Sequence, residues 1–230
     1  MRRWVITDIH GCYHTFKALL EQQIRLSRQD TLYLLGDYIN KGPFSRQVLD
    51  YIMDLRQKGY QLELLRGNHE QEILKVLAGK SDLTSLREKG GGTFLANFGI
   101  DHPADIPEQY IHFFKELKWY LSLDQWLLVH SGFDFEAQDP YQPGEAMLTL
   151  REYTVDTRQT GGRRVLHGHT PTDLEQIIKT LEDTTALDIS LDAGCVYRGN
   201  PRQGRLLALE LGSWQWLSQP NIDISENYQP

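Results

Sequence analysis

Short apolar runs alternate with longer amphipathic segments over the first 77 residues. In the longer segments apolar residues recur every three or four positions, which is typical of helices that bury one face. The strands expected from this pattern lie at 4–7, 31–35 and 61–65, and the helices at 13–28, after 43, and at 70–77. Alternation of strand and helix predicts a parallel sheet with helices packed against it.

The remainder of the chain has a less regular pattern. Helical segments are expected at 81–98, with an interruption by three glycines at 90–92, and at 106–117. Further strands are expected as a pair within 119–130, at 163–169, at 189–196, and as a hairpin within 205–218. Because no repeat and no long linker divides the chain, we expect one domain over residues 1–230, with a flexible tail at 218–230.

The composition argues against several classes of protein. Apolar residues make up 40% and the formal charge is −7, with no basic block that could follow a phosphate backbone. A globular protein that does not bind nucleic acid is therefore expected. Cys12 and Cys195 form no CxxC pair, so neither a disulfide framework nor a cysteine zinc site is indicated. No signal peptide or membrane-spanning stretch is visible, which favours a cytoplasmic protein without a membrane partner. The oligomeric state is left open.

Side chains that commonly bind metals follow five of the expected strands. They are Asp8 and His10, Asp37, Asn68 and His69, His130, and His167 and His169. Asp8 and His10 lie two positions apart and would share one face if their strand continued through them. Because the carboxyl ends of strands in open α/β sheets meet at one crevice, these groups are expected to converge.

Each of these residues has an ordinary structural explanation when it is taken alone. An aspartate can cap a helix, and an asparagine is common where a strand ends. Independent capping does not explain the same residue types at five strand ends, so together they indicate a metal site. Mixed Asp, His and Asn ligands without cysteine suit Mn²⁺, which we expect first, or Fe or Zn²⁺. Six ligands are too many for one catalytic zinc, whereas two divalent ions roughly 3.5–4 Å apart that share a carboxylate would use them all.

Five sequence blocks resemble the signature of the calcineurin-like metallophosphoesterases. They are D-I-H-G at 8–11, G-D-Y-I-N-K-G at 36–42, G-N-H-E at 67–70, H-S-G at 130–132 and G-H-T at 168–170. The blocks are similar to those of the phosphoprotein phosphatase branch, including bacterial and phage-type serine/threonine phosphatases. L-D-A-G-C-V-Y at 191–197 resembles a C-terminal segment of bacterial members. The resemblance implies an α/β fold with a central β-sandwich, flanking helices, and an active site at the carboxyl ends of the strands.

The resemblance also implies a role for each ligand. The first metal would be held by Asp8 and His10, both metals by Asp37, and the second by Asn68, His130 and His169. A metal-bound hydroxide would attack phosphorus while His69, as general acid, protonates the leaving oxygen. His167 has no counterpart among the family's ligands, so we expect it to support a ligand or to serve in packing.

Two positions depart from the family pattern. Protein phosphatases usually have D-R-G where this chain has Asn40-Lys41-Gly42, and the missing aspartate is the one that orients and charges the acid histidine. Asn40 can hydrogen-bond to His69 but stabilises its protonated form less, so slower cleavage of poor leaving groups is expected. Lys41 keeps the positive charge without the guanidinium fork and would bind phosphate as a point charge. Arg151, in L-R-E at 150–152, is the candidate for a bidentate phosphate clamp, with a surface salt bridge as the alternative.

Three functions remain open on the sequence alone. The first is a phosphatase for phosphomonoesters, including phosphoserine and phosphothreonine in proteins. The alternative is symmetrical hydrolysis of diadenosine tetraphosphate, because G-D-Y-I-N-K-G-P-F-S at 36–45 resembles that subfamily too. Against it, Glu70 stands where such enzymes typically have aspartate. The third is a non-catalytic metal-binding module, which is disfavoured because the chain retains every ligand and the acid histidine.

Overall fold

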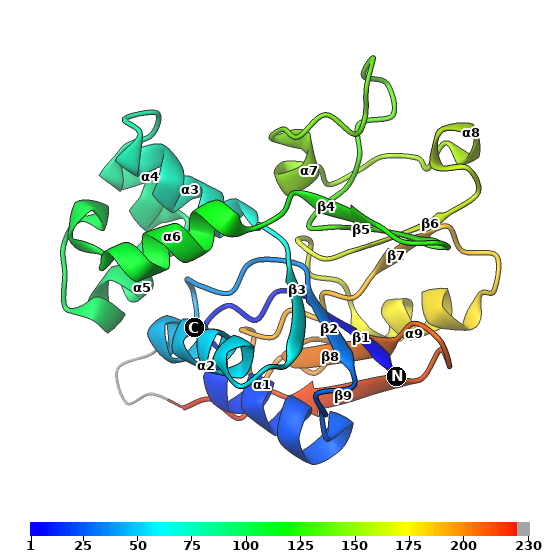
Figure 1. Ribbon diagram of the computed structural model, residues 1–230, viewed down its shortest axis with the longest axis horizontal. Helices are drawn as coiled ribbons and strands as arrows, with labels where there is room; N and C mark the ends of the chain where they lie inside the picture. The colour runs from blue at the N-terminus through cyan, green and yellow to red at the C-terminus, as the bar shows by residue number, and fades with distance from the viewer. Residues whose placement is uncertain (225–230) are drawn as a thin grey trace.

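Two β-sheets pack face to face in the computed structural model, which describes residues 1–224 (Figure 1). The first sheet contains, in spatial order, β3 (Gln61–Leu64), β2 (Thr31–Leu34), β1 (Arg3–Ile6), β8 (Arg205–Glu210) and β9 (Trp216–Pro220). The second contains β4 (Tyr120–Ser122), β5 (Trp126–Val129), β6 (Arg164–His167) and β7 (Asp188–Ser190). Both sheets are mixed, because the hairpins β4–β5 and β8–β9 add antiparallel strands to a parallel set. The expected sandwich is confirmed.

The central strands are apolar on both faces because each face is covered. In β1, Trp4 and Ile6 pack into the core beneath the helices, whereas Val5 points into the core between the sheets. This alternation follows the two-residue period of a strand. Strands buried on both sides read as continuous apolar runs, which is why the sequence pattern located them.

Most of the helices lie where the sequence pattern predicts them. They are α1 (Tyr13–Ala18), which continues in π-helical turns over Leu19–Ile24, α2 (Ser45–Gln57), α3 (Asn68–Leu77), α4 (Leu83–Glu88), α5 (Gly91–Phe98), a 3₁₀ turn (Pro103–Asp105), α6 (Glu108–Glu116), α7 (Ala146–Thr149), α8 (Thr157–Thr160) and α9 (Leu174–Glu182). Gly90, with φ of 84°, separates α4 from α5 as the glycine run predicts. Helices α3 to α6 form a group beside the sheets, joined to them after β3 (Figure 1).

The C-terminal segment is attached to the first helix rather than free. Strand β9 runs to Pro220, and Asp223 is buried. The Asp223 carboxylate accepts hydrogen bonds from His14 N at 2.8 Å, Thr15 N at 3.0 Å and Thr15 Oγ1 at 2.6 Å. The expectation of a flexible tail is therefore wrong for residues 218–224, and residues 225–230 lie outside the described part. None of the helices described is long and apolar enough to cross a membrane.

Candidate metal centre

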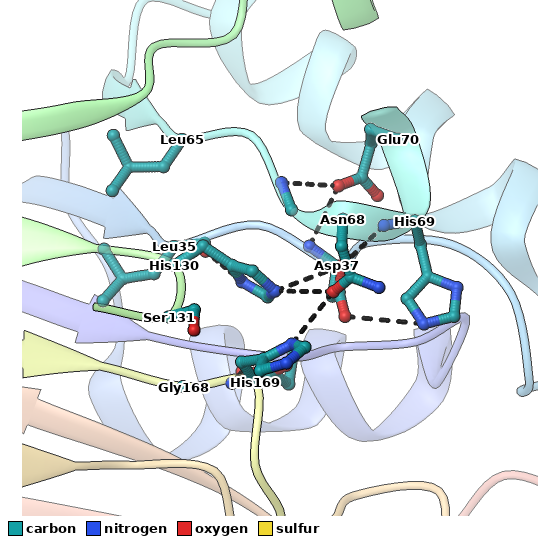
Figure 2. Close-up of polar contacts among 12 residues, drawn as sticks. Leu35, Asp37, Leu65, Asn68, His69, Glu70, His130, Ser131, Gly168 and His169 are labelled. Atoms are coloured by element: carbon teal, nitrogen blue, oxygen red, sulfur yellow. Dashed lines mark hydrogen bonds and ion pairs between the residues drawn. The ribbon is translucent and has the colours of Figure 1, made fainter. Parts of the chain in front are cut away.

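The predicted ligands converge where strands of both sheets end (Figure 2). Asp8 and His10 follow β1, Asp37 follows β2, Asn68 and His69 open α3 after β3, His130 follows β5, and His169 follows β6. The expectation that Asp8 and His10 share a strand face is wrong, because β1 ends at Ile6. Both residues instead have φ of 46°, which turns the chain sharply at the edge of the sheet.

The loops of this centre hold their backbone in a conformation that side chains disfavour. Among the described residues, the non-glycine positions with positive φ are Asp8, His10, Arg25, Asp37, Asn40, Lys41, His169 and Trp214. All of these except Arg25 and Trp214 belong to the predicted site. Left-handed non-glycine residues cost of order 1–3 kcal/mol each and persist where the surroundings over-determine them. The site is therefore held in place by its surroundings against local backbone preference.

Asp37 lies between two groups of potential ligands, as the close-up shows (Figure 2). Its Oδ2 atom is 3.4 Å from His10 Nε2 and 3.7 Å from His69 Nε2. Its Oδ1 atom is 3.5 Å from His130 Nε2, and the second group is completed by His169. Each oxygen of one carboxylate thus faces a different cluster, which is the arrangement that a shared ligand between two cations requires.

Backbone carbonyls fix the orientation of two histidines. His10 Nδ1 lies 3.0 Å from Ile39 O, and His130 Nδ1 lies 2.9 Å from Leu35 O. A carbonyl can only accept, so Nδ1 carries the proton in both rings and Nε2 keeps its lone pair. These Nε2 atoms lie 3.4 Å (His10) and 3.5 Å (His130) from the carboxylate oxygens of Asp37. Metal-binding histidines commonly have this support from a carbonyl.

Asn68 joins the second cluster through its side-chain oxygen. Asn68 Oδ1 is 3.0 Å from both His130 Nε2 and His169 Nδ1. His169 Nε2 is buried and has no partner among the described residues. Asn68, His130 and His169 thus converge beside Asp37, and such a set of oxygen and imidazole ligands fits a divalent cation.

Asp8, predicted as a ligand, is not part of the two groups around Asp37, and it connects the loops after β1 and β6. The backbone N–H of His169 donates to both carboxylate oxygens of Asp8, at 3.1 and 3.0 Å. Gly168 permits this approach, because a Cβ atom there would lie 1.8 Å from Asp8 Oδ2. The G-H-T block therefore supplies a close backbone contact as well as a histidine.

The proposed acid histidine is paired with the asparagine that replaces the family aspartate. Asn40 Nδ2 lies 2.7 Å from His69 Nδ1, and both side chains are buried. Asn40 Oδ1 has no partner among the described residues, and a half-turn of the amide would place it on the same ring nitrogen. Either orientation leaves His69 Nε2 directed towards Asp37 and the cavity.

Glu70 does more than cap its helix. It is fully buried, and its carboxylate accepts from Gly67 N at 2.9 Å, Asp37 N at 3.0 Å and Tyr38 N at 2.9 Å (Figure 2). It thereby ties the loop after β2 to the start of α3. Burial, together with the charge of Asp37, raises the pKa of Glu70 to about 8. The sequence gives no local signal for the contacts with Asp37 and Tyr38, because that loop is more than thirty positions away.

A cavity of about 530 Å³ opens above the ligands. Its lining includes the predicted phosphate-binding residues Lys41 and Arg151, together with Lys89 and Tyr197. Lys41 Nζ donates to His10 Nε2 at 3.0 Å, so the ammonium occupies the lone pair that a metal would use. Sequence reasoning did not single out Lys89, and it quoted Tyr197 only within the segment 191–197 without a role, because only the tertiary structure brings both to this cavity.

Two residues near the motifs lie outside the cluster. His167 Nε2 contacts Asp188 Oδ1 at 3.1 Å, which agrees with the expected packing function. Arg66 donates to the carbonyls of Phe114 and Lys115 at the end of α6, and its guanidinium lies over Trp119. Arg66 therefore supports the helix group rather than the cavity.

Burial gives the carboxylates and imidazoles of the site opposite shifts. It raises the pKa of Asp37 to about 7 and lowers the pKa of His130 and of His169 to about 3. Burial, with the nearby charges of Asp192 and Asp37, raises the pKa of Asp8 well above its usual value. Asp192, which the sequence analysis did not select, is itself buried, and its pKa is raised to about 6. A divalent cation favours ionised carboxylates and neutral imidazoles, so this donor set fits a pair of such ions.

Bacterial enzymes are among the relatives of this chain by sequence. A symmetrical bis(5'-nucleosyl)-tetraphosphatase of Cronobacter sakazakii is 42% identical over 81 residues, which are 35% of this chain and 28% of that protein. The enzyme of the same name from Salmonella paratyphi A is 38% identical over 104 residues, or 43% of this chain and 36% of that protein. The matched regions thus span roughly a third of the length of these relatives.

Solved structures share the fold over nearly the whole chain. A putative diadenosine tetraphosphatase has a TM-score of 0.67 at 23% identity, covering 97% of this chain and 95% of that one. A serine/threonine phosphatase from Saccharomyces cerevisiae has a TM-score of 0.62 at 14% identity, covering 98% and 82%. The family pattern described as calcineurin-like phosphoesterase matches residues 1–221. With that match and the ligand clusters described above, the chain belongs to the calcineurin-like phosphoesterases, a family of hydrolases.

Proposed function

We propose that this chain is a dinuclear phosphoesterase that hydrolyses dinucleoside tetraphosphates symmetrically. The observation that carries the proposal is Asp37, whose two oxygens each face one ligand cluster beneath a cation-lined cavity. In this assignment Asp8 and His10 hold one ion, Asn68, His130 and His169 hold the other, and Asp37 holds both. Mn²⁺ is our first choice, with Fe or Zn²⁺ as alternatives.

Two divalent ions bound there would supply Lewis acidity and an activated water for in-line attack at phosphorus. The residues of the chain orient the substrate around that attack. Arg151 and Lys41 line the cavity and are assigned to the phosphoryl oxygens. His69 holds a proton at Nε2, on the cavity side, for the leaving oxygen, and Asn40 fixes the ring through Nδ1.

The choice of substrate rests on the relatives and on Asn40. The tetraphosphatase relatives favour the dinucleotide over the phosphomonoester that the sequence motifs placed first. The structural neighbours support only the shared fold, because their identities are below 25%. Because the partner of His69 Nδ1 is Asn40 and not a carboxylate, the site is better suited to leaving groups that depart without full protonation, as a phosphate does.

Hydrolysis of phosphomonoesters is the second candidate function. The motif G-N-H-E retains Glu70, and the Saccharomyces cerevisiae phosphatase shares the fold at a TM-score of 0.62. In this reading the cavity of about 530 Å³ would receive a phosphorylated side chain instead of a nucleotide. The two functions differ in the leaving group, which makes them separable by assay.

Parallel assays with supplied Mn²⁺ test the proposal. The purified chain is given diadenosine tetraphosphate, a phosphoserine peptide and p-nitrophenyl phosphate, and the products are separated by chromatography. Two molecules of ADP per diadenosine tetraphosphate are expected, with Asp37→Asn as the control for contaminating phosphatases. Release of ATP and AMP would contradict symmetrical cleavage. A preference for the phosphopeptide would instead establish the second candidate.

A further inference from the structure

Lys89 lies on the cavity wall beyond the ligands of the metal centre. It follows α4 and precedes Gly90, and both residues line the cavity together with Lys41. Lys41 N donates to Gly90 O at 3.4 Å, and a Cβ on Gly90 would lie 3.2 Å from Lys41 Cγ. The turn between α4 and α5 is thus packed against the loop that carries Asn40 and Lys41. This contact brings the two lysines to the same wall.

A buried carboxylate holds the Lys89 side chain in place. Lys89 Nζ lies 2.7 Å from Glu72 Oε2, and the Glu72 side chain is only 4% exposed. Ser85 Oγ donates to Glu72 Oε1 at 3.0 Å, and Ser81 Oγ donates to the same atom. The Lys89 side chain itself is 48% exposed. An ammonium has three N–H groups, so Lys89 can keep its bond to Glu72 and still donate to a ligand in the cavity.

Lys89 and the proposed acid His69 line the same cavity. Burial keeps the pKa of His69 well below its usual value, and the charges of Lys41 and Lys89 act in the same direction. A leaving group next to His69 Nε2 would occupy the same cavity as Lys89, because both residues line it. The cavity lining contains three cationic side chains, Lys41, Lys89 and Arg151. Glu88 adds a carboxylate to the same lining.

We propose that Lys89 is a specificity-determining residue that binds the departing nucleoside diphosphate. The inference rests on the proposed function. When the P–O bond breaks, its electron pair goes to an oxygen of the leaving phosphate, while the water oxygen bonds to the attacked phosphorus. A terminal phosphate has a second pKa of about 6, so this oxygen can depart as an anion that a lysine stabilises. An alcohol leaving group of a phosphoserine carries no such charge for Lys89 to bind.

The test compares Lys89→Met with Lys80→Met, an exposed lysine in the turn between α3 and α4. For each variant, kcat/KM is measured on diadenosine tetraphosphate and on p-nitrophenyl phosphate. Lys89→Met removes a hydrogen bond to a charged group. The value of kcat/KM on the dinucleotide is therefore expected to fall roughly 10- to 100-fold. The loss on p-nitrophenyl phosphate is expected to be smaller, because nitrophenolate carries one delocalised charge and no further phosphate for Lys89 to bind, so the ratio of the two constants falls. Lys89→Arg should restore most of that ratio.

Product inhibition gives an independent measurement. The inhibition constant of ADP should rise in Lys89→Met by a larger factor than that of orthophosphate, which lacks the outer phosphate. Equal ratios in Lys89→Met and Lys80→Met would overturn the inference while leaving the proposed function intact. Absence of dinucleotide hydrolysis by the unaltered chain, with p-nitrophenyl phosphate still cleaved, would overturn both. Because Lys89→Met removes a partner of Glu72, thermal melting must show that the variant is folded, and Lys89→Gln serves as the second variant.

Discussion

Asn40→Asp restores the carboxylate that family protein phosphatases place beside the acid histidine. Asn40 has φ of 69°, a conformation that aspartate tolerates about as well as asparagine, so the backbone should not change. The backbone N–H of Asn40 donates to Ser45 Oγ at 3.0 Å, and this bond does not depend on the side chain. The substitution therefore tests the contact between residue 40 and His69, which is 2.7 Å long.

The size of the effect follows from the charge and the burial of this pair. A neutral hydrogen bond contributes about 1 kcal/mol and one to a charged group about 1.5–3 kcal/mol, a difference of up to about 2 kcal/mol. At 1.36 kcal/mol per tenfold, this corresponds to a gain of roughly 30-fold in the rate on a substrate that needs full proton transfer. We expect the upper end of this energy range because the side chains of Asn40 and His69 are both shielded from water.

The assay is a series of aryl and alkyl phosphates with leaving groups of increasing pKa, measured with the same metal for each protein. The dependence of log kcat on leaving-group pKa should become shallower in Asn40→Asp, with the largest gain on alkyl phosphates. Nitrophenyl phosphates should change little, since nitrophenolate leaves without a proton. Asn200→Asp, in an exposed loop, is the matched control for the added charge. An identical slope in both proteins would refute a limiting role of residue 40.

Three further outcomes follow from the geometry. Metal analysis should find two ions per chain, and Asp37→Asn should lose at least one of them; two ions in the variant would rule out the bridge. Asp223→Ala should lower the melting temperature by ~2–8 °C through a loss of about 1–2 kcal/mol, and Asp101→Ala, at an exposed position, by less; equal shifts would show that the Asp223 carboxylate does not stabilise the fold. Gly168→Ala should displace Asp8 and reduce metal content, and unchanged content would contradict that contact.

Local patterns were sufficient for the strands, for most helices and for the residues of the site. The apolar runs located β1, β2, β5 and β8, because these strands are buried on both faces, and β3 was located although it is a partly exposed edge strand. Helix α9 escaped prediction although Leu174, Ile177 and Leu181 have helical spacing and Asp173 stands at its N-cap. This spacing and this N-cap are sufficient to predict the helix Leu174–Glu182 from the sequence.

The relations between distant segments had no local signal. The contact of Asp223 with α1 joins positions about two hundred residues apart. The polar sequence of the C-terminal segment carries no sign of this contact, so a flexible tail was predicted. Likewise, Cys12 and Cys195 are buried in one core, and burial together with the Cys12 thiol raises the pKa of Cys195 well above its usual value, although their spacing suggested no relation. Only packing of the sheets and helices determines such neighbours.

The sequence by itself determined the family, the order of the strands that carry the motifs, and the residue types available to a metal. Each of these depends on short stretches whose periodicity or motif spacing is local. The tertiary structure decided that Asp37 faces two clusters, that Glu70 joins two loops, and that Lys89 shares a cavity with Arg151. These features arise because strand ends from two sheets meet at one edge, and positive backbone angles there aim the side chains at a common point.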